Sequence, residues 1–130
     1  MKVTTAAMLA TIGTAQTLRE LGDSLGVYMG SAINMYHKDD DTRYDQYFKT
    51  QHSIAVAEYE CKMNIIRPTR NSWNFDRCVY AFEYAIENNM EFRGHALVWG
   101  ATNKVPNIVP GWLKWETNPA TLDRELKDHI

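Results

Sequence analysis

The order of a strand, a helix and a second strand is the feature of this sequence that most constrains its fold. A short apolar run, residues 53–57, ends just before Glu58, and a longer one, residues 90–98, continues into Trp99. Between them, apolar side chains recur with the 3.6-residue helical period at Phe75, Cys78, Val79, Phe82, Ala85 and Ile86. Strands that alternate with helices in this way usually pair in parallel. We therefore predict an α/β fold whose functional site lies beyond the carboxyl ends of parallel strands.

Capping and turn residues predict the N-terminal elements. Thr17 and Glu20 have the spacing of a capping box, so a helix is expected over residues 18–25, ending at Gly26. Residues 27–33 are predicted to form a first strand that Asn34 closes. A polar loop is expected over residues 36–42 and a short helix over residues 44–50.

Proline positions predict the C-terminal elements. Residues 65–73 and the stretch from Gly100 to Trp115 are expected to be irregular, because prolines interrupt regular structure there. Asn118 and Pro119 have the order of a helix cap followed by a first-turn proline. The final helix is predicted to bury a stripe of Leu122, Leu126 and Ile130.

Length, charge and composition narrow the function. The chain has 130 residues, enough for one modest domain, and its net charge of -2 gives no reason to expect a nucleic-acid partner. No apolar run is long enough to cross a membrane. Three adjacent aspartates, residues 39–41, lack the alternating spacing of a calcium loop, so no metal or cofactor is predicted. Four Trp and seven Tyr suit a sugar- or peptide-binding surface, although by count alone a bulky core is the favoured explanation.

The two cysteines and the N-terminus are the residues that indicate in which cellular compartment the chain functions. We expect Cys61 and Cys78 to be buried free thiols, with a single bridge as the alternative. Residues 1–15 resemble a signal peptide, with Gln16 as the first mature residue, which predicts secretion and a mature domain over residues 16–130. A disordered tail or a first helical turn is the alternative interpretation of residues 1–15.

Glu58 and Lys62 stand four residues apart, just after the buried strand of residues 53–57. Both side chains can converge on one pocket at the end of that strand. They can equally form a surface ion pair that contributes less than about 1 kcal/mol. The spacing alone leaves both interpretations open.

Several motifs together resemble one enzyme family. Residues 93–99, RGHALVW, are similar to the third-strand signature of the glycoside hydrolase family 10 barrels, the endo-β-1,4-xylanases. Residues 57–63, AEYECKM, resemble the second-strand segment of that family, which usually reads Pro or Ala, then Glu, Asn, Glu, Met, Lys and Trp. Shorter matches follow in the family order at residues 73–76, 88–90, 110–113 and 129–130, so the resemblance covers residues 17–130.

The resemblance implies a partial (β/α)8 TIM barrel, of which the chain would supply the first three strand–helix units with parallel strands. A complete barrel needs about 250 residues. The family uses two catalytic glutamates, one after strand four and one on strand seven, and both positions are expected beyond Ile130. No catalytic residue is therefore assigned to this chain, and the chain alone is predicted not to hydrolyse xylan.

The resemblance also implies a substrate-binding set for a β-1,4-linked, xylan-like polysaccharide. Glu58 and Lys62 correspond to residues that hydrogen-bond sugar hydroxyls, and His95 to a histidine that holds the network of carboxylates. Trp112 corresponds to a tryptophan that packs on the sugar, with Trp99 at the strand end beside it. Asn34 and Tyr59, at the ends of the first two predicted strands, complete the set.

Three departures from the family pattern leave other functions open. Tyr59 replaces an asparagine, Gly100 replaces a second histidine, and the stretch from Trp99 to Trp112 is longer than usual. A three-strand piece of a barrel also has open edges. A non-catalytic polysaccharide-binding protein, or a structural subunit whose half-barrel is covered by the remainder of the barrel or another chain, is the alternative to a hydrolase segment.

Overall fold

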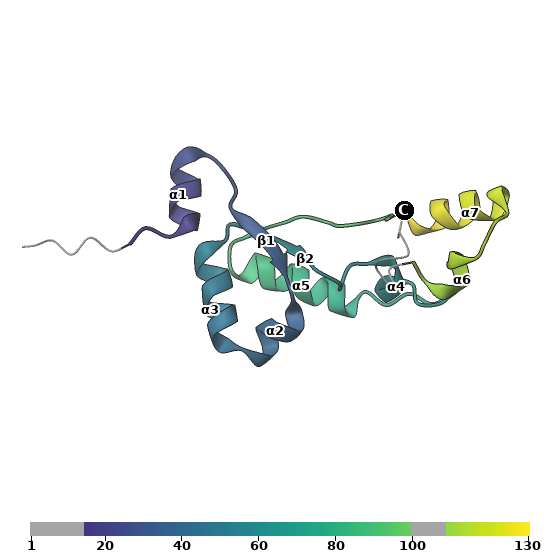
Figure 1. Ribbon diagram of the computed structural model, residues 1–130, viewed down its shortest axis with the longest axis horizontal. Coiled ribbons are helices and arrows are strands. Elements are labelled where there is room, and N and C mark those ends of the chain that lie inside the picture. The colour runs from purple at the N-terminus through teal and green to yellow at the C-terminus, as the bar shows by residue number, and fades with distance from the viewer. Residues whose placement is uncertain (1–14, 100–108) are drawn as a thin grey trace, which may run out of the picture.

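The structure, a computed structural model, describes residues 15–99 and 109–130 (Figure 1). Its elements in chain order are α1 (Leu18–Leu25), β1 (Gly30–Ile33), α2 (Met35–Asp40), α3 (Thr42–Gln51), β2 (Ile54–Ala57), α4 (Met63–Ile66), α5 (Asp76–Glu87), β3 (Glu91–Phe92), α6 (Gly111–Lys114) and α7 (Pro119–His129). None of the helices in these two ranges is both long enough and apolar enough to cross a membrane. The predicted signal peptide, apart from Ala15, and Gly100 lie outside the described residues.

The three strands form one parallel sheet in the order β1-β2-β3, which confirms the prediction from the strand–helix–strand pattern. Two strands are shorter than predicted: β1 starts at Gly30, and β3 covers only Glu91–Phe92. The pairing of β2 with β3 joins Ile54 to Glu91 and Ala55 to Phe92, and the residues after Phe92 leave the strand. They continue instead as an extended segment that runs toward α7 (Figure 1).

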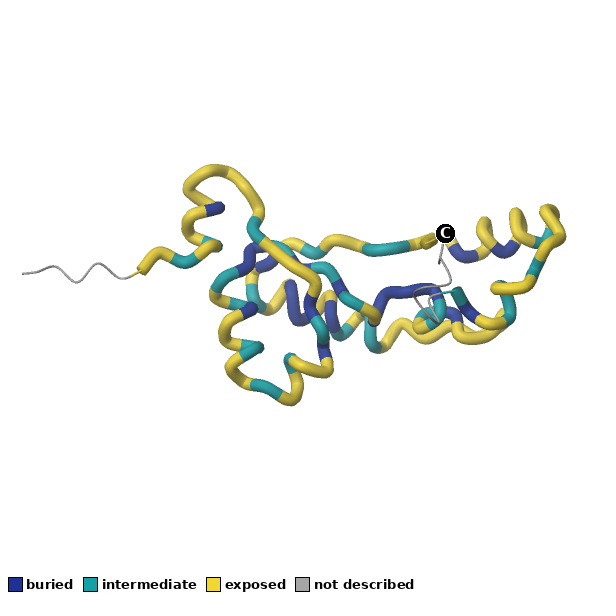
Figure 2. Tube along the Cα trace, in the orientation of Figure 1, coloured by how far each residue is buried: buried dark blue, intermediate teal, exposed yellow. Residues whose placement is uncertain are grey.

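One face of the sheet carries the core. Ala55 and Ala57 of β2 are buried together with Ala81 and Ala85 of α5 and with Phe48 of α3. The small alanine side chains let helix and strand approach closely. Buried positions accordingly gather where β2 and α5 meet, whereas α6 has no buried residue (Figure 2).

The α5 helix buries a different face from the one predicted. Its bulky side chains remain exposed, with 49% of Phe75, 44% of Val79, 47% of Phe82 and 54% of Ile86 accessible to solvent. Ala81, Tyr84 and Ala85 face the sheet instead. The helix is apolar on two sides, and only the side with small residues fits against the alanines of β2. The predicted stripe was therefore wrong for most of its members.

The predicted loop over residues 36–42 is also wrong, because α2 and the start of α3 occupy it. The side-chain oxygen of Asn34 accepts hydrogen bonds from the backbone N–H groups of Tyr36 and His37 and so caps α2. Asp41 caps α3 through the N–H of Arg43. One of the polar residues that suggested a loop, Asp41, is thus a helix cap, and caps share the composition of loops.

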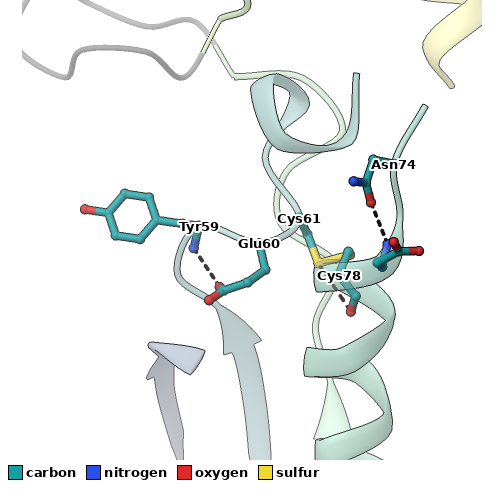
Figure 3. The surroundings of a disulfide bond; sticks show 6 residues. Tyr59, Glu60, Cys61, Asn74 and Cys78 are labelled. Carbon is teal, nitrogen blue, oxygen red and sulfur yellow. Dashed lines mark hydrogen bonds between the residues drawn. A yellow bond between two sulfur atoms is a disulfide. The ribbon is translucent and has the colours of Figure 1, made fainter. Parts of the chain in front are cut away.

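Cys61 and Cys78 form a disulfide, so the expectation of free thiols was wrong (Figure 3). The bond joins the segment after β2 to the first half of α5. The rotation of α5 that buries Ala81 and Ala85 also turns Cys78 toward this segment. Cys61 lies in the turn after β2 and Cys78 lies in α5, so only the packing of these two parts brings the two sulfur atoms together.

The final helix starts after its Asn118 cap as predicted, but its buried residues differ from the prediction. Leu122, Leu126 and Ile130 are exposed, and Glu125 and His129 are buried. Arg67, only 4% exposed, explains this orientation, because its guanidinium donates to Oε2 of Glu125 at 2.8 Å. An ion pair, rather than an apolar stripe, thus determines which side of α7 faces inward.

Candidate functional site

The candidate site lies at the carboxyl ends of the strands, on the face of the sheet opposite α5. Side chains alternate between the two faces of a strand, so Ala55 and Ala57 point to the core while Ile54 and Val56 point to the open face. Glu58 follows with the parity of Ile54 and Val56. The strand therefore presents the Glu58 carboxylate on the open face, where a (β/α)8 barrel has its interior.

Asn34 holds the Glu58 carboxylate in place. Its side-chain Nδ2 donates to Oε2 of Glu58 at 2.8 Å, across the ends of β1 and β2. The backbone N–H of Asn34 donates to the hydroxyl of Tyr44 at 3.1 Å, and its Oδ1 caps α2. Asn34 is thus fixed at three atoms, which orients the carboxylate.

Lys62 is the second charged group of the site. It is only 4% exposed, and its Nζ lies 4.5 Å from the centre of the Trp99 ring. Burial lowers the pKa of the Lys62 ammonium, while the nearby charge of Glu58 opposes that shift. The backbone N–H of Lys62 donates to the carbonyl of Tyr59 at 2.9 Å, which fixes the turn between Glu58 and Lys62.

His95 extends this arrangement on the side of β3. Its ring centre lies 5.7 Å from that of Trp99. The positive charge of Lys62 lowers the pKa of His95, and burial and Arg93 act in the same direction. The imidazole is therefore neutral near pH 7 and can either donate or accept a hydrogen bond.

Trp99 and Lys62 also line a cavity of about 60 Å³, whose other walls are Met63, Ala96, Val98, Val109 and Leu113. Pockets for small-molecule ligands measure roughly 300–1,000 Å³, so this cavity is too small to enclose a sugar ring. A sugar would have to bind on the open face at the strand ends. Among residues 15–99 and 109–130, no group of three His, Cys, Asp or Glu side chains is placed to hold a metal ion.

The structure places the other two predicted residues differently. Tyr59 is 49% exposed, and its ring lies on the opposite side of the chain from the disulfide (Figure 3). Trp112, in α6, donates from its indole Nε1 to the carbonyl of Arg67 at 3.2 Å. The Arg67 guanidinium lies 4.8 Å from the ring centres of both Trp73 and Trp112. Trp112 thus contacts Arg67, the residue that pairs with Glu125 of α7.

Glu60 is a structural residue of the site that the sequence did not single out. Its carboxylate is 2% exposed and accepts hydrogen bonds from the backbone N–H groups of Met35 and Tyr59, both at 3.1 Å. Glu58 and Glu60 look alike in the sequence, but the chain turns after Glu58.

Comparison with known proteins gives a consistent result along most of the chain. The model of glycosyl hydrolase family 10 matches residues 17–130. Endo-1,4-β-xylanase B of Thermotoga neapolitana is 32% identical over 116 residues, which are 87% of this chain and 32% of that protein.

Solved structures agree in fold. Xylanase 10B from Thermotoga petrophila, crystallised in complex with xylobiose, matches with a TM-score of 0.77 and 33% identity over 89% of this chain and 35% of that one. Native xylanase 10B from Thermotoga maritima matches with a TM-score of 0.76 and 32% identity, over 88% of this chain and 34% of its own. The chain spans about a third of the length of these relatives. Its three parallel strands fit a partial (β/α)8 fold. It belongs to glycosyl hydrolase family 10.

Proposed function

We propose that this chain is the N-terminal segment of an endo-1,4-β-xylanase-like hydrolase and forms a wall that holds the sugar units of a β-1,4-linked xylan. The observation that carries the proposal is the hydrogen bond between Asn34 and Glu58 on the open face. Lys62, which is buried, and Trp99, which is exposed, lie beside this pair. The relative from Thermotoga petrophila, which was crystallised with xylobiose, supports a xylan-type ligand.

The side chains of this wall have complementary roles toward a sugar. The Glu58 carboxylate accepts hydrogen bonds from sugar hydroxyls, and the Lys62 ammonium donates to hydroxyl oxygens. Charged hydrogen bonds of this kind are roughly twice as strong as neutral ones. The ring of Trp99 offers an apolar surface to the C–H groups of a pyranose. The neutral His95 adds one donor and one acceptor.

Binding rather than cleavage is the role proposed for this segment. A retaining glycosidase needs two carboxyl groups about 5–5.5 Å apart, one as nucleophile and one as acid/base. Glu58 is engaged by Asn34, and Glu60 is buried and accepts two backbone N–H groups. Glu60 is therefore not free to complete such a pair with Glu58, and the catalytic pair is proposed to come from later strands of the barrel.

The test is a binding and turnover assay on the purified 130-residue chain. We expect retention on insoluble xylan and measurable heat on titration with xylobiose, without release of reducing sugar. Glu58→Gln and Lys62→Met should each weaken binding, whereas Lys127→Met, on the exposed side of α7, should not. Equal retention of all three variants would refute the proposed wall, and turnover by the chain alone would refute the proposed lack of catalysis.

A structural role is the second candidate. It is favoured by exposed apolar side chains along α5, because such patches mark sites of contact with a partner protein. These side chains are Val79, Phe82 and Ile86 of the helix and its N-cap Phe75. Light scattering separates the two functions, because a defined oligomer that does not bind xylan would support the structural role. Retention on xylan by a monomer would exclude it.

Secretion is proposed as well, and the disulfide supports it. Disulfides persist mainly in oxidising environments such as the extracellular space. Expression of the chain with its own N-terminus, followed by mass spectrometry of the medium, should find a product that begins at Gln16. A product retained inside the cell that still begins at Met1 would contradict this proposal.

A further inference from the structure

The segment that links Glu58 to Lys62 is held from two sides, and we infer that the Cys61–Cys78 disulfide and the Glu60 carboxylate are positioning groups for the sugar-binding wall. The inference rests on the proposed function, because it concerns the same two charged residues. It adds a role for three residues that do not face the sugar themselves.

Glu60 provides the first attachment. Its Oε1 accepts a hydrogen bond from the backbone N–H of Met35, the first residue of α2, at 3.1 Å. Its Oε2 accepts from the N–H of Tyr59 at the same distance. One buried carboxylate thus joins the middle of the segment to the element that begins just after Asn34, the partner of Glu58.

The disulfide provides the second attachment, which leads to α5 rather than to α2. Cys61 lies directly between Glu60 and Lys62, and its partner Cys78 is on α5, 17 residues away (Figure 3). The α5 helix is itself anchored in the core by Ala81, Tyr84 and Ala85. The bond therefore fixes Cys61, the residue before Lys62, to a helix that is packed in the core.

Lys62 is the residue that most needs such an attachment. Its ammonium is buried against the Trp99 ring, and burial of a charge is unfavourable unless the geometry supplies compensating contacts. A lysine has a long, flexible side chain that can swing into water. A fixed backbone directly before Lys62 opposes that movement.

The first test replaces both cysteines with serine, which keeps the side-chain size and removes the bond. We expect the affinity of the chain for xylobiose to fall about tenfold, the loss that accompanies one misplaced charged hydrogen bond. Thr17→Ala is the matched control, because it removes the capping box of α1 and destabilises the fold outside the segment from Glu58 to Lys62. It should lower the thermal midpoint and leave the affinity unchanged.

A second measurement does not depend on sugar binding. In the folded chain, the charge of Lys62 lowers the pKa of His95. If the double serine variant lets Lys62 move away, the pKa of His95, followed by NMR, should rise toward its ordinary value. Glu60→Gln should shift it in the same direction, because the amide group cannot accept both N–H groups.

The outcomes separate this inference from the proposed function. An unchanged His95 pKa in a folded double serine variant would overturn the inference, whatever the chain binds. A raised His95 pKa in that variant would support the positioning role even if the oxidised chain failed to bind xylobiose. That failure would count against the proposed function alone.

Discussion

The side-chain amide of Asn34 donates a 2.8 Å hydrogen bond to the carboxylate of Glu58 and so joins the carboxyl ends of β1 and β2. The oxygen of the same amide caps α2. One side chain therefore does two separate things, since its donor orients Glu58 and its acceptor starts a helix. Substitutions at Asn34 can separate these roles.

Asn34→Asp should retain the cap and lose the donor. We expect thermal stability close to that of the parent chain, because aspartate caps helices as well as asparagine does. Two adjacent carboxylates repel, so the Glu58 side chain should leave its position and xylobiose binding should weaken. Asn34→Ala loses the cap as well and should cost about 1 kcal/mol of folding free energy in urea unfolding. An aspartate variant that binds like the parent would show that the amide does not orient Glu58.

Lys62→Met should raise the pKa of His95, because the charge of Lys62 is the main cause that lowers it. Proton NMR of the His95 ring as a function of pH measures this directly. Arg93→Gln is the control, since Arg93 contributes in the same direction but less. If the arginine variant shifted the pKa more than the lysine variant, the assigned order of the two charges would be wrong.

His129 should make the attachment of α7 sensitive to acid. Burial is the main cause that lowers its pKa, the charge of Arg67 adds to this, and a hydrogen bond with the Leu97 backbone opposes it. A histidine whose pKa is lower in the folded chain than in the unfolded chain contributes its full stabilisation above the unfolded pKa of about 6.5. This contribution is lost as pH falls through the folded pKa. The free energy of unfolding should therefore decrease between pH 7 and pH 5.

His129→Phe should reduce this pH dependence, because phenylalanine preserves the stacking with Trp73 and cannot be protonated. Urea unfolding at several pH values provides the measurement. His95 also has a lowered pKa, so His95→Gln, measured in the same way, separates its contribution. A phenylalanine variant with the full pH dependence of the parent would exclude His129 as the source.

Removal of the disulfide should also lower global stability. The bridge closes a loop with a sequence separation of 17, and a loop of that size is worth about 3 kcal/mol through the restricted unfolded chain. Urea unfolding of the double serine variant should show a loss of this order. A loss of only a few tenths of a kcal/mol would indicate that the reduced, unfolded chain is already compact.

The site was predictable where strand order alone positions residues. Asn34 and Glu58 follow neighbouring parallel strands, and the sequence locates both strand ends within a few residues. The family resemblance adds Lys62, His95 and Trp99, which the structure finds close to one another. Their role in sugar binding stays a prediction. Trp112 matched a short motif, but its observed contacts are with the arginines near α7.

The sequence by itself determined the parallel strand–helix–strand order, the caps that start α1 and α7, and the family. These depend on local periodicity and on residues close together in the chain. The tertiary structure alone decided which face of α5 is buried, that Cys61 reaches Cys78, and that α7 turns Glu125 rather than its leucines inward. The physical reason is that a helix with two apolar sides, or with a buried charge, is oriented by the shape and charge of what it packs against.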